Sequence, residues 1–506
     1  MSAPSHSLDR QEPTRHVSKR RSRPSVLSLI EIADKKVEDL LAKFAGVFQI
    51  GTPKFLYRTS YLQAVLVFML LFYFGLDAFT MVIFEDRHTM TAEISAFRQA
   101  TLLSIFALSI PYMLFTRQNF QHILKLQLPL MALMAFCALS LIWTVSPDAT
   151  KTRVILFYVQ VLPIFALFAA RPSKKFFFDS MCIASSIVLV FNALSFFVQF
   201  SFDPNTDIGY RAYFSSKNLL GMFAMLSLGI WICALLYYEN RRLKIVSAAM
   251  LALSAYFLII SDSKTSFAVA IVSIVPALFL AFAVKSGQRA MFFTMLISFV
   301  FMTGFGFFLV WYGFDPITEG IYGDTTLTGR TEIWGHLFRF INEDPWLGVG
   351  YRGFWDAGAD SPHLQLPEYL SFNQGHNGYI DALLTIGGLG LIFLAIYILQ
   401  PFFALMRIAK GQGGPSHSTP LLAAFLFFPI CAILHNITES SYMMLDMSAF
   451  AAVVFATMVI SAVNRKFDRV SFADDTTKAK RASLRKAERK RKARMAERER
   501  MRAASA

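Results

Sequence analysis

Long apolar runs recur through this chain of 506 residues, and they restrict its fold more than any other feature. The hydrocarbon core of a bilayer is about 30 Å thick, and a helix needs roughly 20 apolar residues to cross it. The twelve runs that approach this length are residues 61–80, 97–115, 127–144, 154–170, 178–200, 213–238, 245–260, 265–284, 291–312, 379–400, 419–435 and 443–463. Because lipid cannot satisfy backbone N–H and C=O groups, each run must be helical. The sequence therefore predicts an all-α polytopic membrane protein with about 12 transmembrane helices.

Composition and cysteine placement agree with this class. Hydrophobic residues make up 55% of the chain, the mean hydropathy is +0.47 and the formal net charge is +15. All four cysteines lie inside apolar runs, where a thiol packs as a small hydrophobe, so we expect no disulfide framework. We see no spacing typical of metal ligands and expect neither a metal nor another cofactor. The first apolar run follows a long polar stretch, so we expect the first helix, and no cleaved signal peptide, to direct insertion.

The distribution of Lys and Arg predicts the orientation. With an even number of spans both termini share one side, and that side holds 39 of the 49 basic residues. Cytoplasmic loops carry such an excess, so both termini are predicted to be cytoplasmic. Orientation disfavours cations on the outer side, so those found there need another explanation. The ten are Arg87, Arg98, Lys151, Arg153, Arg211, Lys217, Lys264, Arg330, Arg339 and Arg352.

The spans and polar segments divide the chain into five regions. These are a cytoplasmic basic arm (1–58), nine membrane helices (59–312), a large outer loop (313–378), three membrane helices (379–463) and a cytoplasmic basic tail (464–506). The arm contains either an interfacial amphipathic helix or a weakly ordered segment. A loop as long as the third region is functional or disordered, and its content of Trp, Phe and Tyr argues against disorder. The tail is expected to attract anionic lipid or acidic protein partners, with no nucleic acid.

Three cations are predicted on the outer rim before the large loop. Arg211 lies at the water boundary, and Lys217 and Asn218 begin the sixth span. If Lys217 and Asn218 face the bundle, the helix N-terminus and the cation together form an anion site; if they face water, no site follows. The tight turn SDSKTS between the seventh and eighth spans needs polar residues. It does not need a lysine, so Lys264 becomes the third candidate.

The large loop contains two further motifs. TGRTEIW begins a short helix with Trp334 on its apolar face, and Arg330 falls in the first turn, where a cation opposes the helix dipole. A guanidinium fork and nearby N–H groups can hold a pair of phosphate oxygens. The second motif, PWLGVGYRGFW, is a turn whose glycines allow close approach of the backbone. It contains Arg352 and Tyr351, whose ring either stacks on a sugar or packs within the loop.

Several polar residues lie at the start of the tenth span. His376 and Asn377 lie at its start, and Asp381 follows about one turn deeper. His376 is either a plain interfacial residue or a general base, because histidine, with an ordinary pKa near 6.5, suits proton removal at neutral pH. His435 and Glu439, near the end of the eleventh span, form a second polar pair that we interpret as structural.

The order of these motifs carries a resemblance. YFSSKNLLG, SDSKTS, TGRTEIW, PWLGVGY and GHNGYIDALLTIGGLGLI together resemble the bacterial O-antigen ligase and polysaccharide polymerase family. The TGRTEIW form is most similar to exopolysaccharide polymerases of the succinoglycan type. The likeness covers roughly residues 124–463 and is densest over 211–391. It implies a metal-independent glycosyltransferase of the bacterial inner membrane, which transfers a glycan from undecaprenyl pyrophosphate to an acceptor glycan hydroxyl on the outer face.

The resemblance also implies roles for particular residues. Arg330 and Arg211 correspond to arginines that hold pyrophosphate, and His376 to the histidine that activates the acceptor. Many family members have Ser-Arg in the tight turn where this chain has Ser-Lys, so Lys264 keeps the charge but lacks the bidentate fork. The chemistry is consistent, since cations stabilise an anionic leaving group and a hydroxyl nucleophile benefits from a base. Hydrolysis of a glycoside commonly needs two carboxylates instead.

Several functions compete at this stage. Polymerisation of repeat units competes with ligation of the polymer to a lipid A core. A flippase for lipid-linked sugars should show polar breaks at mid-membrane and paired repeats, which we do not find in the sequence. A scaffold organised by the basic tail, together with other polysaccharide assembly proteins, is the remaining alternative. The enzyme hypothesis makes one spatial prediction: Arg211, Lys264, Arg330 and His376 meet in one cavity that opens to the outside.

Overall fold

The computed structural model describes residues 59–84, 92–115, 117–170, 174–198, 205–206, 209–311, 330–355, 374–410 and 419–442. All of them belong to one compact unit, Leu56–Ala506. The predicted basic arm (1–58), the twelfth predicted span (443–463), the basic tail (464–506) and most of the outer loop lie outside the described residues.

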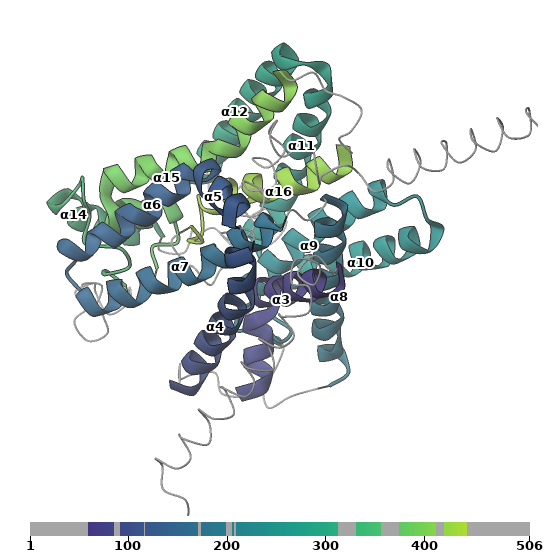
Figure 1. Cartoon of the computed structure of the whole chain (residues 1–506), viewed down its shortest axis with the longest axis horizontal. Helices are drawn as coiled ribbons and strands as arrows, with labels where there is room; N and C mark the ends of the chain where they lie inside the picture. The colour runs from purple at the N-terminus through teal and green to yellow at the C-terminus, as the bar shows by residue number, and fades with distance from the viewer. Residues whose placement is uncertain are drawn as a thin grey trace, which may run out of the picture. The chain divides into compact units, whose positions relative to one another are not determined.

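Thirteen α-helices cover most of the described chain (Figure 1). They are α3 (Thr59–Phe84), α4 (Ala92–Phe115), α5 (Arg117–Leu126), α6 (Leu128–Leu139), α7 (Pro147–Ala169), α8 (Lys174–Ala193), α9 (Lys217–Tyr237), α10 (Arg241–Ile260), α11 (Lys264–Ala283), α12 (Gln288–Trp311), α14 (Arg330–Glu343), α15 (Gly378–Lys410) and α16 (Thr419–His435). Short 3-10 helices follow α6, α8 and α11 at Ser140–Ile142, Leu194–Phe196 and Val284–Ser286. A two-residue antiparallel pair, β1 (Asn205–Thr206) and β2 (Gly209–Tyr210), precedes α9.

Eight described helices are long and apolar enough to cross a membrane. A ninth span results if α5 and α6, which are bent by 79° at Gln127, are counted together. Two shorter apolar helices cover Gln288–Gly304 and Thr419–His435. The helical membrane class predicted from the sequence is confirmed, while the exact number of spans stays a prediction.

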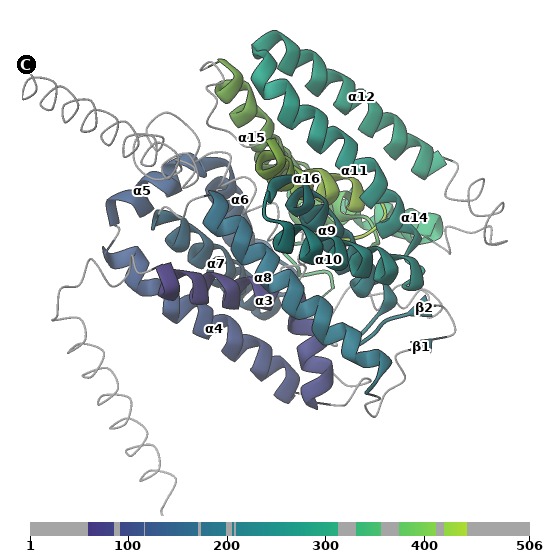
Figure 2. The same ribbon diagram turned by 90° about the vertical axis from the view of Figure 1, so that its right-hand side faces the viewer.

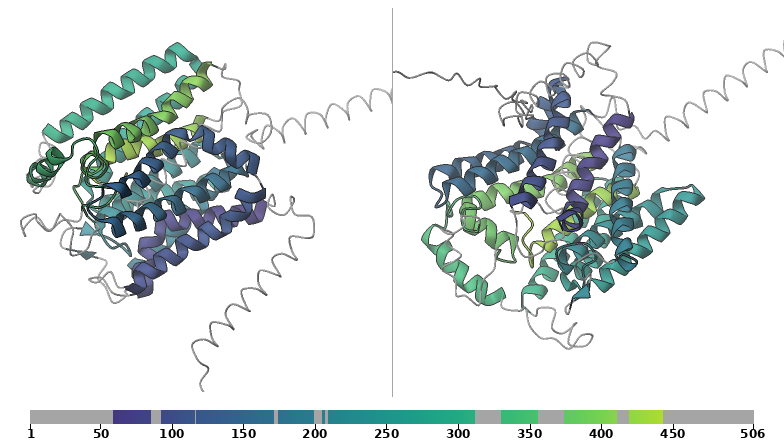
Figure 3. Two further views of the ribbon diagram at one scale, coloured as in Figure 1. Left: turned by 60° about the vertical axis from the view of Figure 1, so that its left-hand side comes forward. Right: turned by 90° about the horizontal axis from the view of Figure 1, so that it is seen from below.

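The helices differ in how they bury their apolar side chains. Almost every residue of α16 is buried, and α16 packs against α9 and α11. Figure 2 shows α16, α11 and α12 side by side. A helix that is apolar on all faces belongs in the interior. By contrast, α10 and α12 keep many large apolar residues exposed, as helices that face lipid do. In both views of Figure 3, α14 lies at the edge of the helices, and it packs on α15.

One break in α15 joins it to the second loop motif. Gly387 has φ 64° and ψ −173°, which interrupts the helix. The amide of Gly388 donates to the carbonyl of Pro345 at 2.8 Å, and the amide of Val349 donates to the carbonyl of Leu384 at 3.1 Å. A Cβ on Gly387 would lie 2.3 Å from the backbone of Trp346. Only glycine allows both the positive φ and this contact. The close backbone approach predicted for the PWLGVG turn therefore occurs, and its partner is α15.

Candidate functional site

Three helix ends meet at one end of the bundle. The amide of Gly378, the first residue of α15, donates to the carbonyls of Asn436 at 2.9 Å and Glu439 at 3.1 Å, in the turn that follows α16. The hydroxyl of Thr438 in the same turn lies 3.4 Å from that of Thr265 in the first turn of α11. The starts of α11 and α15 and the end of α16 are thus directly connected.

His376 lies immediately before α15 and is paired with an acid. Its φ of +48° is in the left-handed region, which is uncommon for a residue with a side chain and recurs at functional sites. Its Nδ1 is 3.1 Å from Oε2 of Glu439, and the two side chains are 19% and 12% exposed. When Nδ1–H donates to the carboxylate, the neutral imidazole carries its lone pair on Nε2. This arrangement orients the ring and makes Nε2 the basic nitrogen.

Asn377 serves as the N-cap of α15. Its Oδ1 accepts from the amides of Tyr379 at 3.0 Å and Ile380 at 3.1 Å, while its Nδ2 donates to the carbonyl of Ile437 at 2.9 Å. An N-cap of this kind stabilises a helix by about 1 kcal/mol. The side chain therefore fixes the start of α15 against the turn after α16, and in this way it holds His376 beside Glu439.

Asp381 is a buried carboxylate, 2% exposed, with donors on both oxygens. Oδ1 accepts from Nε1 of Trp355 at 3.2 Å, and the amide of Gly375 donates to Oδ1 and Oδ2 at 3.1 and 3.2 Å. Arg352, also buried and with φ 61°, acts on Asp381 through its charge. A buried charge needs such partners. Asp381 thus holds the backbone that leads into His376.

The two aromatic candidates of the large loop pack inside the protein. Trp334 in α14 donates its Nε1 to the carbonyl of Gly375 at 2.8 Å. The ring of Tyr351 is 1% exposed and stacks on Phe157, with ring centroids 5.7 Å apart. The structure therefore shows the packing that was one alternative for Tyr351, and stacking on a sugar stays a prediction. Trp334 thus supports the turn that carries His376, while Tyr351 packs against α7.

The side chain of Lys217 binds Asp262 in the turn between α10 and α11. Lys217 is the first residue of α9, and its Nζ lies 3.4 Å from Oδ2 and 3.3 Å from the carbonyl oxygen of Asp262. The side chain of Ser216 caps the helix by accepting from the amide of Leu219 at 3.3 Å. Asn218 is exposed. Lys217 therefore contacts the turn between α10 and α11, whereas Asn218 faces solvent, as in the second of the two alternatives given for this helix start.

Lys264 begins α11, two positions after Asp262, which is the partner of Lys217. Two glycines let the neighbouring segments approach this turn: a Cβ on Gly221 would lie 2.4 Å from Cβ of Ser263, and one on Gly209 would lie 2.6 Å from the carbonyl oxygen of Ser261. Side chains at these two glycines would push α9 and the preceding hairpin away from the turn. The two glycines thus keep the start of α9 against the start of α11.

Arg211 lies in the turn before α9. Its Nη1 donates to the carbonyl of Ser215 at 3.5 Å, and the amide of Ser215 donates to Oδ2 of Asp77 in α3 at 2.7 Å. None of the sequence motifs includes Asp77, so sequence reasoning missed its contact with this turn. Arg330 is the first residue of α14, and its side chain lies outside the described residues.

The predicted site residues are thus only partly brought together. The contacts above connect the segments of Arg211, Lys264 and His376 at one end of the bundle. These three residues do not line the cavity between α12, α15 and α16, nor the small cavity beside Asp77. Their meeting in a single cavity with Arg330 stays a prediction. The expected pair of His435 with Glu439 is joined through the backbone, where the amide of Glu439 donates to the carbonyl of His435 at 2.9 Å. The carboxylate of Glu439 contacts His376, and a pairing of the His435 and Glu439 side chains stays a prediction.

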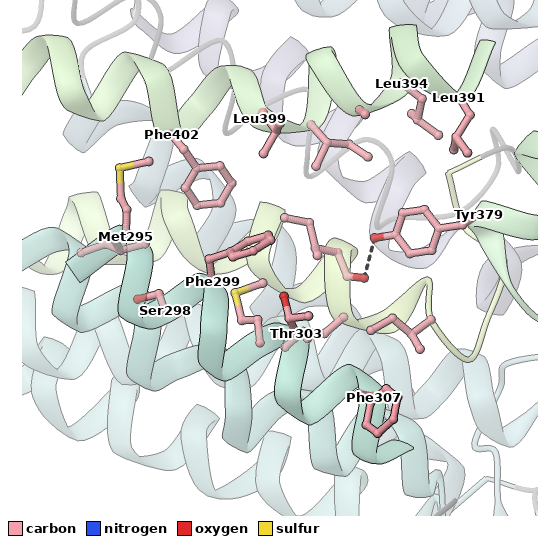
Figure 4. Close-up of a pocket in the computed structure, with 17 residues that line it drawn as sticks. Met295, Ser298, Phe299, Thr303, Phe307, Tyr379, Leu391, Leu394, Leu399 and Phe402 are labelled. Carbon is pink, nitrogen blue, oxygen red and sulfur yellow. Dashed lines mark hydrogen bonds between the residues drawn. The ribbon is translucent and has the colours of Figure 1, made fainter. Parts of the chain in front are cut away.

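An apolar cavity of about 620 Å³ extends away from this polar group (Figure 4). It lies between α12, α15 and α16, with Tyr379 at one end and Met295 and Phe402 at the other. The hydroxyl of Tyr379 donates to the carbonyl of Ile433 at 2.9 Å, so the ring presents carbon to the cavity. Ile437, which binds Asn377 through its carbonyl, also lines it. The cavity therefore begins a few residues from His376.

Comparison with known proteins bears on this end of the bundle. Residues 249–395 match the sequence model of the O-antigen ligase family. This segment of the chain is therefore similar to the O-antigen ligase family. The chain is also 25% identical over 343 residues to the exopolysaccharide production protein ExoQ of Rhizobium meliloti (strain 1021), a match that covers 65% of this chain and 78% of that protein. The resemblance predicted from the motifs is confirmed. The matched segment includes Lys264, Arg330 and His376, while Arg211 and Glu439 lie outside it.

Proposed function

We propose that this protein is a glycosyltransferase of the bacterial inner membrane that polymerises exopolysaccharide or O-antigen repeat units. In this proposal it transfers a glycan from undecaprenyl pyrophosphate to an acceptor sugar hydroxyl on the periplasmic face, and it does so without a metal. The observation that carries the proposal is the His376–Glu439 pair, in which His376 lies within the segment that matches the O-antigen ligase family. Among the described residues, no group of three or more His, Cys, Asp or Glu could hold a metal ion.

His376 acts as the general base in the proposed reaction. Its Nε2 takes the proton of the acceptor hydroxyl while the hydroxyl oxygen attacks the anomeric carbon of the donor. A new C–O bond forms, the bond from the anomeric carbon to the phosphate oxygen breaks, and the pyrophosphate leaves with the electron pair. Glu439, 3.1 Å from Nδ1, stabilises the imidazolium that results. A positioned base of this kind contributes roughly 10²- to 10⁴-fold to a rate.

Cations stabilise the leaving group. Negative charge grows on the pyrophosphate as the bond breaks, and preorganised positive groups lower the free energy of that transition state. Arg211 and Arg330 are the proposed bidentate ligands, and Lys264 adds a point charge. Lys217 is held by Asp262, so in this proposal it orders the α10–α11 turn and supports Lys264.

The apolar cavity provides a place for the isoprenoid chain of the donor. Burial of each CH₂ group is worth about 0.8 kcal/mol, so a lipid-linked donor gains affinity from an apolar channel. The cavity between α12, α15 and α16 begins at Tyr379, two residues beyond Asn377, and runs to Phe402 in the later part of α15. A chain in this cavity would leave its pyrophosphate near His376, where the reaction is proposed.

Similarity to a protein named for exopolysaccharide production favours polymerisation over ligation. A host deletion strain that produces either the wild-type protein or His376→Ala tests this assignment on gels of surface glycan. We expect His376→Ala to lose long polymer and retain single repeats. Lipid-linked polymer that accumulates would indicate a ligase, and donor trapped on the cytoplasmic face would indicate a flippase. Normal chain length with His376→Ala would overturn the enzymatic proposal.

The same variant can be studied in proteoliposomes that contain lipid-linked repeat units. Release of undecaprenyl pyrophosphate should fall at least 100-fold with His376→Ala, as expected for loss of a general base. His122→Ala is the matched control, because His122 lies in α5 and takes no part in the proposed chemistry. Equal release by wild type and His376→Ala would remove the base from the mechanism.

A further inference from the structure

Asp77 in α3 is an acid inside a membrane span and binds two partners. Its Oδ1 lies 2.9 Å from Nη2 of Arg98 in α4, and its Oδ2 accepts from the amide of Ser215 at 2.7 Å. The span covers Leu62–Ile83, and the Asp77 side chain is 21% exposed. Ionisable residues within spans are costly and usually have a function. The ion pair uses one carboxylate oxygen, while the other holds the backbone of a segment that lies 138 positions later.

The backbone segment that Asp77 holds also accepts a hydrogen bond from the side chain of Arg211. The amide of Phe214 donates to the carbonyl of Arg211 at 3.0 Å and closes a tight turn. Nη1 of Arg211 then donates to the carbonyl of Ser215. Ser215 therefore binds Asp77 through its N–H and Arg211 through its C=O. A shift of Ser215 would move the carbonyl against which the guanidinium rests.

Packing alone does not fix this turn. Asp77 and Arg98 line a cavity of about 60 Å³ together with Phe214 and with Leu219 in the first turn of α9. Side chains around such a space can shift more easily than those of a close-packed core. The amide of Tyr213 donates to Oδ1 of Asn192 at 3.2 Å and holds the start of the turn. The hydrogen bond from Ser215 to Asp77 holds its end, and the ion pair with Arg98 orients the carboxylate.

We propose that Asp77, oriented by Arg98, is a positioning residue that fixes the Ser215 turn and thereby directs Arg211 toward the pyrophosphate of the donor. The inference rests on the proposed function, because it assigns to α3 and α4 a part in donor binding. It predicts that the acceptor oxygen at position 77 matters for the donor, and that the two charges matter only because they orient it.

Two matched double variants separate the acceptor oxygen from the charges. Asp77→Asn with Arg98→Gln removes both charges but keeps an oxygen for the Ser215 amide, and a hydrogen bond between the two side-chain amides takes over its orientation. Asp77→Leu with Arg98→Leu removes both charges and the oxygen. In proteoliposomes we expect the first variant to keep the wild-type KM for the lipid-linked donor, and the second to raise it about tenfold, as for one lost hydrogen bond. The KM for the acceptor and the level of protein in the membrane should stay unchanged in both.

Arg211→Ala distinguishes a failure of this inference from a failure of the proposed function. If Arg211→Ala raises the donor KM while the Leu–Leu variant does not, only the inference is overturned. If Arg211→Ala itself leaves the donor KM unchanged, the proposed phosphate role of Arg211 fails. Equal losses in both double variants would also overturn the inference, since charge and not the acceptor oxygen would then decide.

A double-mutant cycle gives a readout that a merely structural role would not produce. If Asp77 acts through Arg211, the Leu–Leu variant should add no further rise in donor KM on an Arg211→Ala background. Additive effects would contradict the inference. If the Leu–Leu protein does not reach the membrane, Asp77→Ala with Arg98→Met makes the same comparison with smaller side chains.

Discussion

Two carboxylates flank His376, and their surroundings differ. Asp381, in the first turn of α15, is 2% exposed and accepts from the amide of Gly375 and the indole of Trp355. Glu439, in the turn after α16, places Oε2 against Nδ1 of His376. An acid whose oxygens are occupied by backbone and indole N–H groups is part of the scaffold. An acid paired with a titratable ring is placed to take part in a proton transfer.

The largest effect should follow from Asp381→Ala. The change would leave the amide of Gly375, the indole of Trp355 and the charge of Arg352 without their buried acceptor. Removal of one member of such a buried set costs about 3–5 kcal/mol. We expect little folded protein in the membrane, measured by detergent-solubilised yield and thermal unfolding, and a smaller loss for Asp381→Asn. A normally folded but inactive Asp381→Ala protein would place Asp381 in the chemistry and erase the contrast with Glu439.

The opposite pattern is expected for Glu439→Gln. The amide keeps the shape of the carboxylate but removes the charge that stabilises the imidazolium of His376, and it can favour the wrong tautomer. The value of kcat should fall roughly 10- to 100-fold, with unchanged thermal unfolding and donor KM. Glu343→Gln, an exposed acid at the end of α14, is the control. A loss of stability without a change in kcat would make Glu439 a scaffold residue like Asp381.

Local sequence patterns predicted the parts of this site but not its pairings. The borders of the apolar runs predicted that His376 and Asn377 lie at the start of a span. They also predicted the cations at the helix starts. The partner of His376 lies 63 positions away, and the i, i+4 spacing of His435 and Glu439 pointed instead to each other. Such pairings depend on how helix ends meet in three dimensions. The sequence signal available for Glu439 was the presence of an acid in a short outer turn, where the turn itself does not require an acid.

An intermediate effect is expected for Asn377→Ala, which touches both sides of the comparison. The variant loses the cap of α15 and the bond to the carbonyl of Ile437. Loss of the cap costs about 1 kcal/mol of stability, and the looser start of α15 should let His376 move away from Glu439. We expect a small drop in melting temperature and a several-fold drop in kcat. Asn377→Asp, which keeps the cap oxygen, should recover the stability; if it does not, the capping role is wrong.

The smallest effect concerns the donor side. Ala395 is exposed and lines the apolar cavity, so a ring introduced by Ala395→Phe would occupy part of the space assigned to the isoprenoid. Extra volume in a packed apolar site costs about 1–3 kcal/mol, so the donor KM should rise about fivefold or more while kcat changes little. Ile396→Phe is the control, because Ile396 is 47% exposed and lies outside the cavity lining. A donor with a shortened isoprenoid should be affected less by Ala395→Phe, since less of its chain would enter the cavity. Equal effects on both donors would show that the ring acts through the fold, and this would contradict a role of the cavity in donor binding.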